Sequence, residues 1–142
     1  MTAAARADAA LHAVAWAAIF VFGVVMALLG AVLPAITPRL GLTLGDMGRL
    51  FLVMNSAMMA ASLLLGLVVD RAGLKAPMVA GALLVAGGAW LVPRAPDVAT
   101  LLVAVACLGS GGGALNGAAN TLVADLHDDP RRKASALNVL GV

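Results

Sequence analysis

The sequence has little charge and few aromatic residues. Charged residues make up 11% of the 142 residues, aromatic residues make up 4%, and Glu and Tyr are absent. Soluble domains usually carry about 25% charged residues. Hydrophobic residues reach 63% here, which is more apolar surface than a water-soluble fold of this length can bury. The composition therefore predicts an integral membrane protein that contacts the lipid bilayer.

Other scarcities exclude further classes. The single cysteine, Cys107, excludes an intrachain disulfide, and its place in an apolar run is typical of a small buried hydrophobic residue. The net charge is only +2, and a nucleic-acid partner is not expected because such proteins carry a clustered basic patch. We interpret the cluster of charges around His127 as a solvated loop rather than a metal site. No nucleophile–base pair can be assembled either, so we expect no enzyme activity and no cofactor.

Long apolar runs predict an all-α integral membrane fold. A helix of roughly 20 apolar residues crosses a bilayer, and we expect four transmembrane helices plus the start of a fifth. The four spans are expected at about residues 13–36, 48–69, 77–92 and 98–124, and the fifth begins at about residue 134. Because this last stretch contains only nine residues, 134–142, we expect residues 1–142 to be part of a larger protein. Pro34 and Pro38 are expected to unwind the end of the first span.

The fourth span carries two neighbouring rows of residues spaced by four. One row is Gly109, Gly113 and Gly117, and the next is Gly112, Asn116 and Asn120. Rows of small residues let transmembrane helices approach closely, and the short polar turn after the third span predicts that spans three and four lie side by side. The two asparagines, together with Asn55 in the second span, are candidates for binding a polar solute. The alternative is that they form interhelical hydrogen bonds, worth about 0.6–2 kcal/mol.

The loop between the second and third spans has the pattern G-x-x-x-D-R-x-G-x-K. Its residues are Gly66, Asp70, Arg71, Gly73 and Lys75. The pattern resembles the signature loop between the second and third spans of major facilitator superfamily (MFS) transporters. The basic residue that the family usually adds next to this lysine is missing, since Leu74 and Ala76 are not basic. The stretch 113–120 and the later segment 131–138 are similar to the sugar and fucose-permease-like branch of the family.

The resemblance implies a fold and a function. The fold would be the first part of a twelve-helix MFS transporter, a partial amino-terminal half that needs the remaining spans as its partner. The function would be secondary transport of a small polar solute by alternating access, and the fragment is expected to be inactive alone. The resemblance implies that Asp70 and Arg71 join the charge network of the cytoplasmic gate, while Gly66 and Gly73 permit close approach and a tight turn.

Two alternatives stay open. A drug-efflux member of the same family would have a more apolar, aromatic-lined cavity, and a non-transport four-span scaffold or assembly protein would belong to another class. Proton or cation coupling would need residues in other spans, because no ionisable residue lies deep in the four spans. Without such residues the carrier is a uniporter.

The basic residues predict an orientation in the membrane. Lys and Arg collect in cytoplasmic loops. With the amino terminus inside, six basic residues fall on the inner side and three on the outer side. The inner set is Arg6, Arg71, Lys75, Arg131, Arg132 and Lys133, and the outer set is Arg39, Arg49 and Arg94. We therefore expect a cytoplasmic amino terminus, in a bacterial inner membrane.

Overall fold

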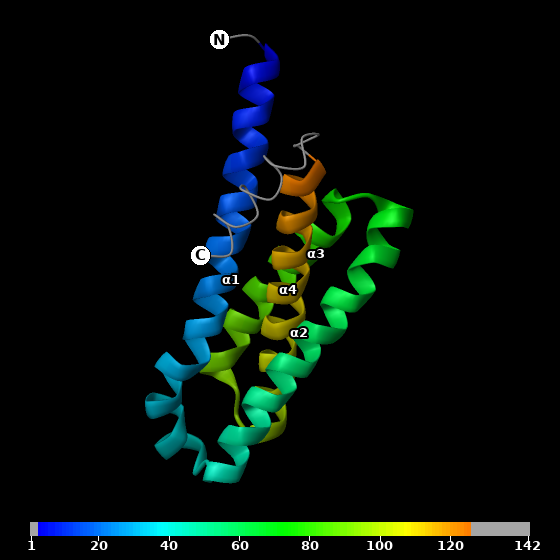
Figure 1. Ribbon diagram of the computed structural model, residues 1–142. Coiled ribbons are helices and arrows are strands. Elements are labelled where there is room, and N and C mark those ends of the chain that lie inside the picture. The colour runs from blue at the N-terminus through cyan, green and yellow to red at the C-terminus, as the bar shows by residue number, and fades with distance from the viewer. Residues whose placement is uncertain (1–2, 126–142) are drawn as a thin grey trace.

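Residues 3–125 form four long helices that run alternately up and down (Figure 1). The computed structural model describes residues 3–125. The helices are α1 (Ala3–Leu40), α2 (Leu44–Ala72), α3 (Lys75–Leu91) and α4 (Val98–Asp125), with a short 3-10 helix, η1 (Val92–Arg94), after α3.

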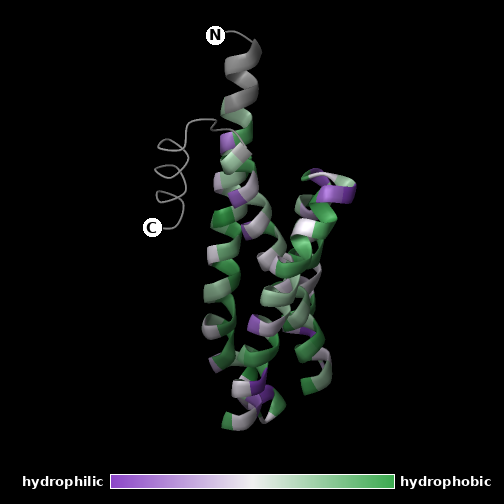
Figure 2. Cartoon of the chain, turned by 45° about the vertical axis from the view of Figure 1, so that its right-hand side comes forward, coloured by the Kyte–Doolittle hydropathy of each residue, from purple (hydrophilic) through white to green (hydrophobic). Residues whose placement is uncertain are grey.

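All four helices are long and apolar enough to cross a membrane. The stretches that qualify are Ala9–Leu40, Leu44–Ala72, Lys75–Arg94 and Val98–Ala124. Each of the four expected spans lies within one of them, while the fifth, from about residue 134, lies outside the described residues. Hydrophobic residues run along the helices and hydrophilic ones gather mainly at helix ends and in the α2–α3 loop (Figure 2). Large side chains such as Phe20 and Leu63 are more than 70% exposed, as lipid-facing residues are.

The end of α1 corrects one expectation. Unwinding was predicted at Pro34 and Pro38, but α1 stays helical through both prolines and ends at Leu40. Each proline removes one backbone N–H donor. Membrane helices tolerate such losses because neighbouring groups reorganise around the freed carbonyls. The chain turns only at Gly41, whose φ of 61° lies in the left-handed region that glycine adopts without steric cost.

The helix α4 lies at the centre of the fold and contacts each of the other three. Two hydrophobic clusters are built on it. In one cluster Leu101 and Leu108 of α4 pack with residues of both α1 and α2. In the other, Leu115 and Ala119 of α4 pack with Ala15 of α1 and with partly buried residues of α3. Among the described residues no polar or charged side chain is buried, so apolar packing holds the helices together.

Glycines set the distance between α4 and its neighbours. A Cβ atom at Gly113 would lie 2.6 Å from the backbone oxygen of Met58 in α2, and one at Gly109 would collide with the backbone of Met54. On the α3 side, a Cβ at Gly111 would lie 2.6 Å from the backbone oxygen of Gly81. The helix α4 therefore meets α2 and α3 backbone against backbone, which confirms the expected close packing at Gly109 and Gly113 and the side-by-side packing of α3 and α4. Gly117, the third residue of the row, faces the side chain of Leu65.

Polar contacts fix the end of the bundle that holds the α1–α2 and α3–α4 turns, called here the turn end. The guanidinium of Arg39, in the last turn of α1, donates hydrogen bonds to the backbone oxygens of Pro93 and Ala95, the second at 2.9 Å. Arg94 lies over the Trp90 ring, 4.4 Å from its centroid. Such a cation–π contact suits a tryptophan at a membrane interface. Arg39 thus joins α1 to the turn between α3 and α4.

Side-chain caps begin the two helices that start at the turn end. Thr43 and Asp46 form a capping box at the start of α2, in which each side chain accepts a hydrogen bond from the other residue's backbone N–H. At the start of α4, Asp97 Oδ1 accepts the backbone N–H of Thr100 at 2.7 Å. This hydrogen bond lowers the pKa of Asp97 below its usual value. Both caps satisfy N–H groups that a helix start would leave without partners.

Two adjacent glycines on α3 provide a matched test of this packing. At Gly88 a Cβ atom would lie 2.7 Å from the backbone oxygen of Ala104 and 2.9 Å from Leu108, whereas at Gly87 it would meet nothing within 4 Å. We expect Gly88→Ala to lower the free energy of unfolding by about 1–3 kcal/mol, since overpacking forces the two backbones apart. Gly87→Ala should cause no loss. Unfolding of the purified protein in detergent measures both free energies, and equal stabilities would contradict backbone-to-backbone packing.

Candidate gate and solute site

The signature loop begins at the end of α2 and is held by local backbone contacts. Gly73 ends the helix with φ of 70°, and its N–H donates to the backbone oxygen of Val69 at 2.9 Å. A side chain would be strained at this φ. The loop is short because α3 begins at Lys75. The tight turn expected at Gly73 is thus confirmed.

The charged residues of the loop are exposed at the end of the bundle. Asp70, Arg71 and Lys75 are all exposed, and their side chains make no hydrogen bond or ion pair within the described part of the chain. Gly66, one turn before Asp70, is also exposed, and a Cβ there would meet nothing within 4 Å. Nothing inside the four-helix bundle therefore requires this glycine or these charges for packing.

The asparagines of α4 form a pair. Asn120 Nδ2 donates to Asn116 Oδ1 at 3.5 Å, one helical turn away, and both side chains are partly buried. The hydrogen bond lies within α4 rather than between helices. Among the described residues, Asn116 and Asn120 are the only two polar amides of α4. We call the strip that they occupy the amide face.

The contacts of neighbouring glycines place the amide face. Gly112, four residues before Asn116, faces Phe22 and Val25 of α1, whereas Gly113, three residues before it, faces Met58 of α2. Residues three and four apart share a side of a helix. Asn116 therefore lies between the part of α4 that contacts α1 and the part that contacts α2. Figure 1 shows these two helices separating toward the end that carries the signature loop, with α4 between them.

The third predicted amide, Asn55, lies apart from this pair. Its Nδ2 donates to the backbone oxygen of Phe51 on its own helix at 2.8 Å, and the side chain is exposed. The neighbouring Met54 lies opposite Gly109, which is seven residues before Asn116. At 1.5 Å per residue, this places Asn55 about 10 Å from the level of Asn116 along the bundle. The structure thus joins two of the three predicted residues and separates the third.

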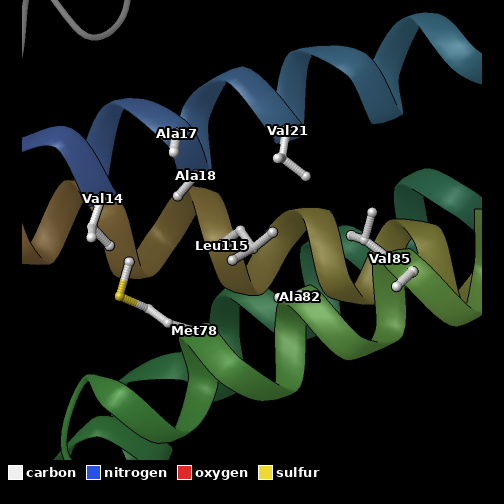
Figure 3. A pocket seen from close by; sticks show the side chains of 9 residues that line it. Val14, Ala17, Ala18, Val21, Met78, Ala82, Val85 and Leu115 are labelled. Atoms are coloured by element: carbon white, nitrogen blue, oxygen red, sulfur yellow. The ribbon is translucent and has the colours of Figure 1, made fainter.

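The pockets between the helices are apolar and do not include the asparagines. The largest one described, about 410 Å³, lies between α1 and α3 over Leu115 of α4 (Figure 3). Its lining includes Val14, Met78 and Val85 and no aromatic residue. A second pocket between α1 and α3 is also mainly apolar, and Arg39 is its one charged lining residue. Such linings suit hydrocarbon or another helix rather than a polar solute.

The fold and these features define a class of protein. Four apolar helices, each able to cross a bilayer, with charges restricted to their ends, describe a multi-pass membrane protein. Residues 15–142 match the family described as Major Facilitator Superfamily. The chain belongs to this family. No curated protein and no solved structure matches the chain.

Membership of this family determines the general activity of the protein. MFS proteins are secondary transporters rather than enzymes, and each moves a small-molecule substrate across a membrane. The four helices correspond to the amino-terminal region of the family fold. This agrees with the expectation drawn from the signature loop.

One interaction at the turn end was missed from the sequence. Arg39 was counted only as a basic residue that sets orientation, but it binds two carbonyl oxygens more than 50 residues away. Its position after two prolines suggested a loop rather than a helix end. The one available signal was the proline-bounded turn 93–96, whose backbone oxygens lack helical partners and so require donors from elsewhere.

Proposed function

We propose that this chain supplies the first spans of a secondary transporter that moves a small polar solute by alternating access, with the amide face lining the solute path. The observation that carries the proposal is the Asn116–Asn120 pair, because it lies between the α4 contacts with α1 and with α2 and both of its side chains are only partly buried. Alternating access in this family requires two six-span halves that rock about a central site. The remaining spans are therefore the chain's first partner.

The signature loop fits the cytoplasmic gate in this proposal. Asp70, Arg71 and Lys75 are exposed at the end of the α2–α3 hairpin, where they are available to helix ends and charges of the opposite half. Gly66 presents bare backbone on the same face of α2 as Asn55, since they are eleven residues apart, close to three helical turns. Close approach of the opposite half along this face would explain why a glycine is found there.

Other parts of the proposal concern location and coupling. The excess of basic residues on one side supports a cytoplasmic amino terminus, and we place the protein in a bacterial inner membrane. In residues 9–124 every Asp, Lys and Arg lies at a helix end or in a turn. Coupling to a proton or cation would accordingly depend on spans other than these four.

The sugar and fucose-permease-like branch remains our proposal for the subfamily. It is supported by the similarity of 113–120 to that branch and by two amides that can bind hydroxyl groups. The drug-efflux alternative would gain support from an apolar, aromatic-lined cavity. Aromatic residues make up only 4% of the chain, and the two amides on α4 favour a polar solute. The scaffold alternative is disfavoured because the chain belongs to a family of transporters.

The gate is tested by Asp70→Asn, which removes the charge and keeps the shape. In the intact transporter, reconstituted in proteoliposomes, we expect transport to fall by roughly 10-fold or more, because a hydrogen bond to a charged group is worth about 1.5–3 kcal/mol. Asp97→Asn at the opposite end is the matched control and should leave transport unchanged, since asparagine also caps helices. Equal uptake by the parent and the Asp70 variant, at matched protein levels, would contradict the gating role.

The solute site is tested by Asn116→Ala. Loss of one neutral hydrogen bond costs about 0.5–1.5 kcal/mol, so we expect KM for the transported solute to rise by about 2- to 10-fold while the melting temperature stays within the error of the parent. The measurement pairs initial uptake rates with thermal unfolding. A lowered melting temperature with unchanged KM would assign Asn116 to packing instead.

A further inference from the structure

The hydrogen bond between the two asparagines divides their binding groups. An amide has two N–H donors and one oxygen acceptor. In this pair Asn120 uses a donor and Asn116 uses its oxygen. The two N–H groups of Asn116, together with the oxygen and the second N–H group of Asn120, are left without a partner among the described residues. If the O and N assignments of both amides are exchanged, Asn116 becomes the donor and Asn120 the acceptor. In either assignment one residue keeps its whole NH2 group free for a solute and the other keeps its oxygen free.

These remaining groups are accessible. No fully buried side-chain nitrogen or oxygen within residues 9–124 lacks a hydrogen-bond partner. The partnerless atoms of Asn116 and Asn120 are therefore not enclosed by the bundle, in agreement with the partial exposure of both side chains. A donor and an acceptor, one helical turn apart, are thus both presented on the amide face.

The pair provides no net charge, and the charges nearest to it lie at the helix ends. Asn116 is nine residues before the end of α4, about 14 Å at 1.5 Å per residue. The charged residues at that end of α2 and α3 are Asp70, Arg71 and Lys75, which are exposed on the signature loop. At the level of Asn116, the four described helices contribute no ionised side chain.

This combination selects for an uncharged partner. An anion would accept from the NH2 group of Asn116 but would face the like-signed oxygen of Asn120. A cation would donate to the oxygen of Asn120 but would face the like-signed NH2 group of Asn116. A group that both donates and accepts, as neighbouring hydroxyls do, satisfies both residues. We propose that Asn116 and Asn120 form one donor-plus-acceptor site for an uncharged, polyhydroxylated solute and discriminate against its ionised analogues; this rests on the proposed transport function.

The test uses three solutes with one carbon skeleton: glucose, gluconate and glucosamine, which are neutral, anionic and largely cationic at pH 7. Initial uptake of each is measured with the intact transporter in proteoliposomes without a membrane potential. We expect uptake of glucose to exceed that of either ion by at least tenfold. Uptake of gluconate or glucosamine at the rate of glucose or faster would overturn the proposed selectivity and leave the transport function in place. If none of the three moves while another solute does, the selectivity is likewise overturned.

A substitution tests whether these residues cause the selectivity. Asn116→Asp keeps the shape, removes the NH2 donors and adds negative charge. The ratio of glucosamine to glucose uptake should rise at least tenfold, while Ser110→Ala, on the α2–α3 side of α4, leaves the ratio unchanged. An unchanged ratio in a folded Asn116→Asp variant overturns the assignment. If that variant does not fold, the relative uptake rates of the three solutes by the parent protein still test the proposed selectivity. A folded parent that transports no solute at all would overturn the proposed function itself.

Discussion

The close approach of backbones around α4 is the constraint on which the rest of the structure depends. Lipid tails are as apolar as the side chains of the bundle, so burial of apolar surface contributes little to holding membrane helices together. Van der Waals contact between closely packed helices must contribute instead. Glycines on α4 and α3 bring the backbone of α4 against those of α2 and α3. With α1 packed on a third side, α4 becomes a central support that is held on three sides.

The same arrangement explains where polar groups can be placed. At Gly109, Gly111 and Gly113 a side chain on α4 would meet the backbone of α2 or α3 at less than ordinary contact distance, so these three positions admit only glycine. The strip between the α1 and α2 contacts is where amides fit without disturbing the packing, and Asn116 and Asn120 are found there. A rigid support that presents a polar face is suited to a transporter half that moves as one body. The charged loop, held by the cap at Gly73, lies at the end of the same bundle.

Much of this fold could be predicted from the sequence because its determinants are local. Apolar runs between charged turns located the helices, Gly73 marked a tight turn, and the spacing by four of Gly109, Gly113 and Gly117 identified a packing face. The continuation of α1 through Pro34 and Pro38 could not be predicted, since tolerance of a proline depends on surrounding groups. The contact of Arg39 with the α3–α4 turn joins distant segments, which no local pattern reveals.

The candidate site was only partly predictable for the same reason. The spacing of Asn116 and Asn120 on one helix showed that their amides could meet, and the structure joins them. Asn55 was grouped with them by residue type alone. The level of Asn55 along the bundle depends on how α2 packs against α4. Met54 of α2 packs against Gly109, and this contact places Asn55 away from the level of the Asn116–Asn120 pair. The exposure of Gly66 and Asp70 likewise follows from the face of α2 that packs on α4.

The most direct measurement is the reaction of single cysteines on α4 with a hydrophilic, membrane-impermeant thiol reagent, made in the intact transporter after Cys107→Ala. Asn120→Cys reports on the amide face, and Ala114→Cys reports on the α2–α3 side of the same helix. If the amide face lines the solute path, the cysteine at position 120 reacts rapidly from water and the one at position 114 does not. Slow reaction at position 120, no faster than at 114, would contradict the placement of the solute path along α4.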